Sequence, residues 1–246
     1  MVAACGGSTS TGSVTATPSA GLSGSLTVFA AASLTEALTD DRTKLAAVNP
    51  GLSLTFSFAG SQQLVAQIES GAPADVVATA DETSMGRLVA ANLVDTPQAF
   101  ATNLLEIAVA PGNPKGVRGL SDLSRPDLRV VLEDPSVPAG KYGRQALDRQ
   151  ATRVNPVSLE LDVKSELAKV ETGEADAGIV YVTDIRSAGG KVSGVPIPAD
   201  QNVIATYPVA VVRATARRGL AQAFVEQLFG GTGRQALLAR GFLAPR

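Results

Sequence analysis

The sequence predicts an α/β protein built from parallel sheets with helices on both faces. Short apolar runs of strand length alternate along the chain with longer segments whose apolar residues recur at helical spacing. Gly, Pro and Asn cluster at the junctions between them, which is typical of βαβ units. Hydrophobic residues make up 45% of the 246 residues, enough for a large buried core in one or two domains.

The first part of the folded region contains three strand–helix units and is expected to begin near Ser25. The first helix has apolar residues at 34, 37, 38, 45 and 48 and ends at an Asn-Pro-Gly turn. Gly71 stops the second helix, and Asp81 caps the third, which runs to about residue 91. The expected strands are 26–30, 52–58 and 75–78, and the first two helices are 34–48 and 62–70.

The second part repeats this alternation without an internal sequence repeat. A strand at 104–110 ends in the turn residues Pro-Gly-Asn-Pro, and a long apolar strand is expected at 203–212. Between them we expect strands 128–132 and 177–182 and helices 140–150 and 163–172. Two helices, 216–229 and 233–240, complete the chain.

The composition excludes several function classes. The chain has no histidine and a single cysteine, so Ser-His-Asp and Cys-His centres and almost every kind of zinc site are ruled out. The formal net charge is −2 and the basic residues are scattered, which argues against nucleic-acid binding. No apolar run approaches the roughly 18 residues that a membrane-spanning helix needs. Carboxylates, lysines, tyrosines and the backbone remain for chemistry.

The amino-terminal segment indicates export. Cys5 follows Val-Ala-Ala and precedes Gly-Gly, the small residues that surround the cleavage site of a lipoprotein. No charged and apolar signal segment precedes it, so Met1 is interpreted as a trimmed start. Residues 1–24 are interpreted as a tether rich in Gly, Ser, Thr and Ala, and a diacylated Cys5 would hold the domain at a membrane surface. The alternative is an unmodified thiol on a flexible terminus.

Three segments share one design, in which a strand ends in a small polar turn that begins a helix. They are FAAASLT at 29–35, FSFAGSQQ at 56–63 and PSVPAGKY at 135–142. Small residues let a ligand approach the unpaired N–H groups at a helix start, and the helix dipole favours an anion there. Each serine taken alone is explained as an ordinary helix cap. Three such turns in one chain without catalytic residues favour an anion-binding site.

The ordered set of motifs resembles the molybdate-binding proteins of ABC importers. FAAASL at 29–34 resembles their opening strand and turn, and four further matches follow in the family's order over residues 25–246. These matches are GAPADV at 71–76, VPAGKY at 137–142, GIVY at 178–181 and YPVAVV at 207–212. The resemblance implies a two-lobed periplasmic-binding-protein fold of type II with the ligand in the cleft between the lobes.

The same resemblance implies the domain boundaries and the site residues. Lobe 1 would comprise 25–105 and 208–246, lobe 2 would comprise 106–207, and 106–110 and 205–208 would act as hinges. The oxyanion would be held by hydroxyl and backbone N–H donors without metal coordination. The donors implied are Ser33, Ser61, Ala139, Val163 and Tyr181.

Two further sets of residues near this implied site are interpreted separately. Gly60 stands where many family members have another serine, which removes a hydroxyl donor and makes the loop more flexible. Lys164 and Glu166 are interpreted as solvated positions on a helix face.

The resemblance also implies how the protein acts. The ligand would be molybdate or tungstate, no cofactor would be needed, and the partner would be an ABC permease at the membrane. The protein would be exported, monomeric and not an enzyme, and it would not bind nucleic acid.

Three alternatives are kept open. A receptor for sulfate or another tetrahedral oxyanion would use the same fold. A glycan hydrolase would use paired carboxylates such as Asp134 and Glu160, although aromatics make up only 4% of the chain and tryptophan is absent. A lipid-anchored structural or adhesion module would leave the three turns without a purpose.

Overall fold

The computed structural model describes Met1 and residues 22–245. Cys5 and most of the predicted tether therefore lie outside the described residues. Within the described part of the chain, no helix is both long enough and apolar enough to cross a membrane.

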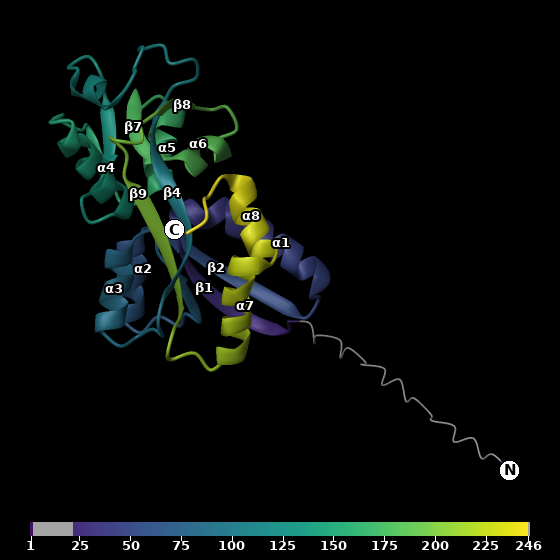
Figure 1. The fold of residues 1–246 in the computed structure, drawn as a ribbon. Coiled ribbons are helices and arrows are strands. Elements are labelled where there is room, and N and C mark those ends of the chain that lie inside the picture. The colour runs from purple at the N-terminus through teal and green to yellow at the C-terminus, as the bar shows by residue number, and fades with distance from the viewer. Residues whose placement is uncertain (2–21, 246) are drawn as a thin grey trace.

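Strands and helices alternate through the described chain (Figure 1). The first part contains β1 (Gly24–Ala31), η1 (Ala32–Leu34), α1 (Thr35–Val48), β2 (Leu52–Ala59), α2 (Ser61–Glu69), β3 (Val76–Ala78) and α3 (Glu82–Ala90). The middle part contains β4 (Gln98–Val109), η2 (Leu120–Ser124), β5 (Val130–Glu133), α4 (Pro138–Arg149), β6 (Ser158–Glu160) and α5 (Val163–Glu171). The last part contains β7 (Ala177–Tyr181), α6 (Val182–Ser187), β8 (Ser193–Pro196), β9 (Ile204–Val211), α7 (Arg218–Gly230) and α8 (Thr232–Arg240).

These elements form two lobes joined by two long strands (Figure 1). Lobe 1 is built on β1–β3 with α1–α3, α7 and α8, and lobe 2 on β5–β8 with α4–α6. The strand order is β2-β1-β3-β9-β4-β7-β5-β6, and β8 also pairs with β4. The pairs β1–β2, β1–β3, β5–β6 and β5–β7 are parallel, whereas those of β4 and β9 are antiparallel.

The strand β4 changes partner where it passes between the lobes. Its residues from Gln98 to Leu104 pair with β9, and from Leu105 onward it pairs with β7. The two adjacent strands β4 and β9 are therefore the continuous backbone that links the lobes. The carboxyl ends of β1 and β2 in lobe 1 and of β5 and β7 in lobe 2 meet between the two lobes.

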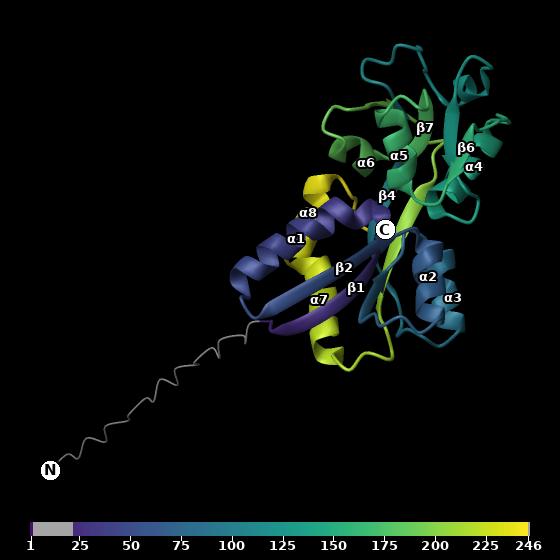
Figure 2. The same ribbon diagram turned by 180° about the vertical axis from the view of Figure 1, so that it is seen from behind.

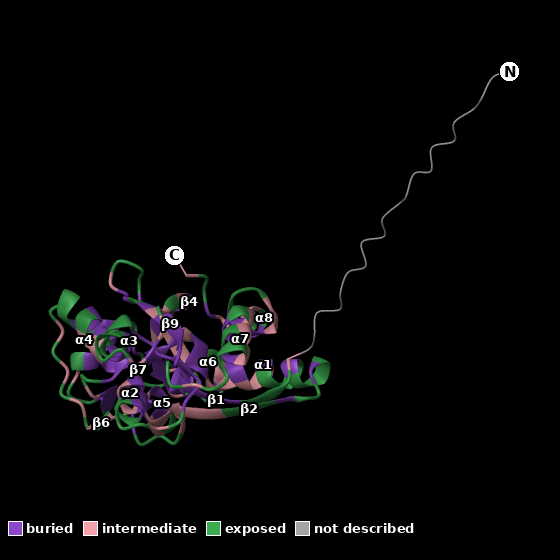
Figure 3. Cartoon of the chain, turned by 90° about the horizontal axis from the view of Figure 1, so that it is seen from below, coloured by how far each residue is buried: buried purple, intermediate pink, exposed green. Residues whose placement is uncertain are grey.

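Each lobe buries both faces of its sheet. In lobe 1, α2 and α3 lie on one side of the strands, and α1, α7 and α8 lie on the other (Figures 1 and 2). Strand alternation divides the core accordingly: Val28 faces the cluster under α1 and α7, while Phe29 faces the cluster under α2 and α3. Buried residues are concentrated in the central strands and on the inner helix faces, and exposed ones lie on the turns, the outer helix faces and the edge strand β2 (Figure 3).

The α/β class and the two-lobed fold predicted from the sequence are confirmed. The antiparallel pairs occur where β4 and β9 join the lobes. The prediction missed β6, β8 and α6, and it began β4 six residues late. These pieces are short, or they carry Gly, Pro, Asn or Ala where strand formers are expected, so no periodic pattern marks them.

Candidate functional site

A small cavity of about 20 Å³ lies between the two lobes. Lobe 1 contributes the turns after β1, β2 and β3, and lobe 2 contributes the end of β5, the starts of α4 and α5, and the end of β7. The lining residues are Ala31, Ala32, Ser33, Ala59, Gly60, Ser61, Ala80, Glu133, Val137, Pro138, Ala139, Asp162, Val163 and Tyr181.

The starts of η1, α2, α4 and α5 converge on this cavity. A parallel strand that turns directly into a helix points the helix amino end at the carboxyl edge of its sheet, and four such turns meet here. The first-turn N–H groups lack intrahelical partners and carry the positive end of the helix dipole. No lysine or arginine is among the described residues that line the cavity. The positive potential therefore comes from backbone N–H groups.

The two serines that line the cavity are both buried, and each has a neighbouring hydrogen-bond partner. Ser61 Oγ accepts the N–H of Ala80 at 3.0 Å, which leaves its own hydroxyl hydrogen free to donate. Ser33 Oγ lies 2.9 Å from Tyr207 Oη, so the phenol can donate to it in the same way. Each hydroxyl oxygen thus has a fixed neighbour, which orients its hydrogen for a further acceptor.

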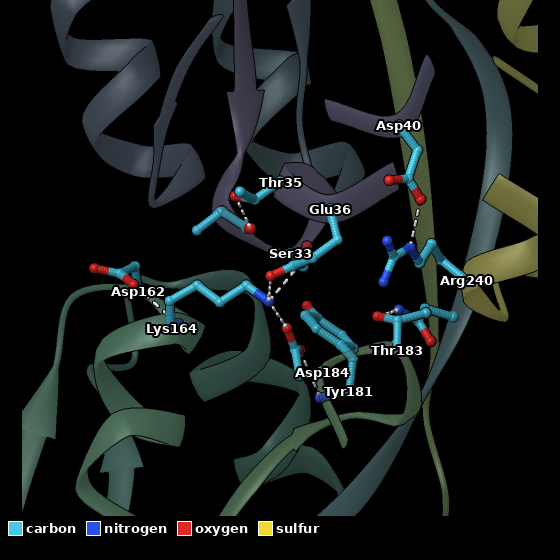
Figure 4. A network of polar contacts seen from close by, with 12 residues as sticks. Ser33, Thr35, Glu36, Asp40, Asp162, Lys164, Tyr181, Thr183, Asp184 and Arg240 are labelled. Atoms are coloured by element: carbon cyan, nitrogen blue, oxygen red, sulfur yellow. Dashed lines mark hydrogen bonds and ion pairs between the residues drawn. The ribbon is translucent and has the colours of Figure 1, made fainter. Parts of the chain in front are cut away.

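Tyr181 supplies a buried phenol with no partner of its own. Only 1% of the residue is exposed, and its Oη makes no hydrogen bond to any described residue. The ring packs edge-on against Tyr207, with centroids 5.9 Å apart, and its hydroxyl end is directed toward Ser33 (Figure 4). Burial raises the pKa of both phenols, so each keeps its proton and remains a donor.

The helix starts from lobe 2 are partly occupied by carboxyl groups. Asp162 caps α5 by accepting the N–H groups of Lys164 and Ser165, both at 2.9 Å. That cap leaves the N–H of Val163 uncommitted. At α4, Glu133 Oε2 accepts the N–H of Gly140 at 3.0 Å, beside Ala139. The site therefore combines neutral donors with two acidic side chains.

The structure brings all five sequence-predicted site residues to one cavity, although their role in binding stays a prediction. Sequence reasoning missed Glu133, whose only signal was a charged residue closing an otherwise apolar strand. Asp134 and Glu160, the carboxylate pair considered for a hydrolase, do not line the cavity. Asp134 accepts the N–H and hydroxyl of Ser136, and Glu160 pairs with Lys169 at 3.0 Å.

The interpretation of Lys164 and Glu166 as solvated residues is wrong. Glu166 is fully buried, and its Oε1 accepts the N–H of Ile179 at 2.6 Å. Lys164 Nζ lies 2.8 Å from Glu36 of lobe 1 and 3.0 Å from the buried Asp184 of lobe 2 (Figure 4). Glu166 lies on the inward face of α5 with Val163, Leu167 and Val170, whereas Lys164 is half-buried and reaches across to Glu36.

Several contacts hold the lobes together around the cavity. Lys164 reaches Glu36, and Lys141 Nζ lies 3.3 Å from Asp81. The amide of Gln62 in lobe 1 donates to the carbonyl of Leu161 in lobe 2 at 2.9 Å. These three contacts join α1 to α5, α4 to the turn before α3, and α2 to the turn before α5. They stabilise a closed arrangement.

Gly60 is required for the close approach of the two lobes. A Cβ at this position would lie 2.3 Å from the backbone oxygen of Leu161, which a real structure does not allow. Its φ of −59° is open to any residue, so the reason for glycine is contact across the cleft. The expectation of a flexible loop therefore gives way to a specific role in packing.

Gly60→Ala is expected to weaken ligand binding while leaving lobe 1 folded, because the added methyl group prevents full closure. We expect a rise of about tenfold or more in the dissociation constant, measured by calorimetric titration. Gly219→Ala is the matched control, since a Cβ there meets nothing within 4 Å. Equal affinity of the Gly60 variant and the control would contradict this account.

The fold and its interlobe cavity define a two-lobed solute-binding protein. The chain belongs to the family of bacterial extracellular solute-binding proteins, whose sequence profile matches residues 26–243. It is 44% identical over 243 residues to the molybdate-binding protein ModA of Mycobacterium tuberculosis H37Rv, covering 98% of this chain and 92% of that protein.

Two further comparisons extend this relationship. YvgL of Bacillus subtilis, whose name describes an ABC transporter substrate-binding lipoprotein, is 31% identical, covering 89% of this chain and 86% of YvgL. The periplasmic molybdate-binding protein of Azotobacter vinelandii has the same fold, with a TM-score of 0.77 and 23% identity over 90% of this chain and all of that one.

Proposed function

We propose that this protein captures molybdate outside the cytoplasm and delivers it to an ABC permease. The observation that carries the proposal is the convergence of helix starts, two serine hydroxyls and the phenol of Tyr181 on one cavity whose lining holds no cationic side chain. The relationship to ModA supports the choice of ligand. The proposed donors are Ser33, Ser61, Ala139, Val163 and Tyr181.

Neutral donors suit a fully deprotonated tetrahedral dianion. Hydrogen bonds to a charged acceptor are about twice as strong as bonds between neutral groups. Several such bonds to one ion can therefore compensate for the loss of its hydration shell. Tungstate has the same charge and nearly the same size as molybdate, so we expect it to bind equally. Sulfate is smaller, and fewer donors reach it at good distance. A sulfate receptor is therefore the second candidate, which direct competition resolves.

We propose that binding and closure are one process. Residues 25–105 with 208–246 would move as one lobe and 106–207 as the other, about the strands β4 and β9. The partner change of β4 at Leu104 and Leu105 supports this boundary. The ion enters between open lobes, and closure brings together donors that neither lobe holds alone.

The location and partners follow from the family and the amino-terminal motif. We propose that a lipid on Cys5 holds the protein at the outer face of the cell membrane, in a periplasm or cell-wall space. The lipoprotein name of YvgL supports this anchor. The protein would act as a monomer, with no cofactor and no enzymatic step. Mass spectrometry of protein from the native host tests the anchor, and an unmodified Cys5 would refute it.

Titration with molybdate, tungstate and sulfate tests the function. We expect both metal oxyanions to bind tightly and sulfate weakly or not at all. Ser33→Ala and Ser61→Ala should each weaken molybdate binding by about tenfold or more, because each removes a hydrogen bond to a charged group. Ser53→Ala, at an exposed site on β2, is the control. Unchanged molybdate affinity in both site variants would refute the donor set.

A further inference from the structure

A buried carboxyl group faces the anion cavity. Glu133 ends β5, is 1% exposed and lines the cavity. Its Oε2 accepts the N–H of Gly140, whereas its Oε1 has no hydrogen-bond partner among the described residues. An acidic side chain in this place competes with the ligand, because both the carboxylate of Glu133 and the oxyanion accept hydrogen bonds from N–H groups at the start of α4.

A second buried carboxyl group lies on the same face of the sheet. Side chains two residues apart share a face of a strand, so Glu133 and Val131 point the same way. Val131 is in register with Gly178 of β7, and the Cβ that Gly178 lacks would lie 3.1 Å from Val131 and 2.8 Å from Glu166 Oε1. Glu166 is fully buried, and its Oε2 also has no partner. Each of the two carboxyls thus has one bound oxygen and one unpartnered oxygen.

No cation neutralises this pair within the described chain. On α5, Lys164 is engaged by Asp184 and Glu36 and Lys169 by Glu160, and Arg144 donates to the backbone oxygen of Glu133. Burial raises the pKa of Glu133 and of Glu166, and the charge of Glu133 raises the pKa of Glu166 further. The charged and titratable groups around the pair are Arg144, Glu160, Asp162, Lys164, Tyr181 and Asp184.

We propose that Glu133 and Glu166 form a buried carboxyl pair that takes up a proton from solvent when the oxyanion enters the cavity. This inference rests on the proposed function. A dianion beside an ionised carboxylate is repelled, so binding favours the state in which the pair holds more protons. Protonated Glu133 can keep its carbonyl oxygen on Gly140 and donate its O–H from the unpartnered oxygen.

The same protonation bears on selectivity. Hydrogen phosphate carries a proton that needs an acceptor, and an ionised Glu133 would supply one inside the cavity. A protonated Glu133 supplies only a donor, which suits molybdate and leaves the proton of phosphate without a partner. Proton uptake therefore converts an acidic residue from a competitor of the ion into a donor for it.

The direction of the pH dependence follows from linkage. Both carboxyl groups have a raised pKa in the free protein, and the bound anion raises it further. Affinity is therefore greatest below the pKa of the free pair and falls as the pH rises through it, by at most about tenfold per pH unit for one linked proton. Molybdate itself does not titrate near neutral pH.

Calorimetric titration of the full chain with sodium molybdate from pH 6.5 to 9 tests the proposal. Repeating each titration in buffers of different ionisation enthalpy counts the protons taken up per ion. We expect uptake approaching one proton in part of this range, accompanied by the predicted fall in affinity. Glu133→Gln and Glu166→Gln should each reduce the uptake, and Glu226→Gln, at an exposed position of α7, should not.

The outcomes separate the two hypotheses. Tight molybdate binding without proton uptake at any pH would overturn the carboxyl pair and leave the proposed function standing. Uptake that persists unchanged in the folded Glu133→Gln and Glu166→Gln proteins would also overturn it. No molybdate binding at any pH would refute the proposed function, and the inference would fail with it. The unmodified protein alone decides the question if a variant fails to fold.

Discussion

Replacing Lys164 with methionine is expected to destabilise the protein by about 3–5 kcal/mol and to lower its melting temperature on the order of 10 °C. Lys164 is the cation that pairs with Asp184, which is fully buried, at 3.0 Å. Burial by itself lowers the pKa of Lys164, but Asp184 and Glu36 raise it more, so the amine stays charged. Methionine keeps the packing of the aliphatic stem but leaves the carboxylate without a cation, with only the N–H of Tyr181 still bonded to it at 3.2 Å.

The same substitution should also weaken molybdate binding, because the Lys164–Glu36 ion pair joins the two lobes. Thermal unfolding of the ligand-free protein and calorimetric titration measure the two effects separately. The double variant Lys164→Met/Asp184→Asn should recover much of the stability, since it removes the unpaired charge, but not the interlobe contact.

Lys191→Met is the control for Lys164→Met. Lys191 pairs with Glu171 at 3.5 Å on the surface, with 69% of its side chain exposed, and should change stability by no more than about 0.5 kcal/mol. A loss of less than about 1 kcal/mol in Lys164→Met would show that Asp184 is neutral in the folded protein, and the ion-pair account would fail. Burial raises the pKa of Asp184, so the size of the loss in Lys164→Met distinguishes a charged Asp184 from a neutral one.

The sequence carried most of the fold because long elements follow simple periods. The helix α1 and the strands β1 and β2 have regular apolar spacing with clear stop signals, and their predicted limits agree with the structure within a few residues. The short strands β6 and β8 and the six-residue α6 have no room for a period. Their presence depends on pairing with β4 and β5 or on packing, which is tertiary information.

The candidate site divides in the same way. The turns at Ser33, Ser61 and Ala139 were visible because small residues mark where a strand becomes a helix. Tyr181 and Val163 were predicted only from the family resemblance, since nothing in their own sequence context indicates a binding site. The burial of Glu133 and Glu166 could not be predicted, because charged residues are mostly exposed in folded proteins. Only the register of β5 with β7 and the packing of α5 reveals that both are buried beside the cavity.

Tyr181→Phe is expected to change stability and affinity in opposite directions. The ligand-free variant should be more stable by about 1–3 kcal/mol, because it loses a buried hydroxyl that has no partner among the described residues. Molybdate should bind about 10–100-fold more weakly, because a hydrogen bond to a charged acceptor contributes about 1.5–3 kcal/mol. Melting curves with and without molybdate, together with titration, measure both effects.

Tyr207→Phe is the control that separates the two roles of a buried phenol. Its hydroxyl bonds to Ser33 at 2.9 Å and does not line the cavity, so its removal should lower the stability of the ligand-free protein. A Tyr181 variant that loses stability without ligand, as the Tyr207 variant should, would show that its hydroxyl has a structural partner.

Stability and affinity are expected to change in opposite directions in Tyr181→Phe because the anion site is made of neutral donors. Donors that find partners inside the empty protein gain nothing from the ligand, so a tight site keeps some of them unsatisfied. The buried hydroxyl of Tyr181 is such a donor at the cavity. The free energy that it costs the empty protein is returned when the oxyanion binds, which favours the closed, occupied state.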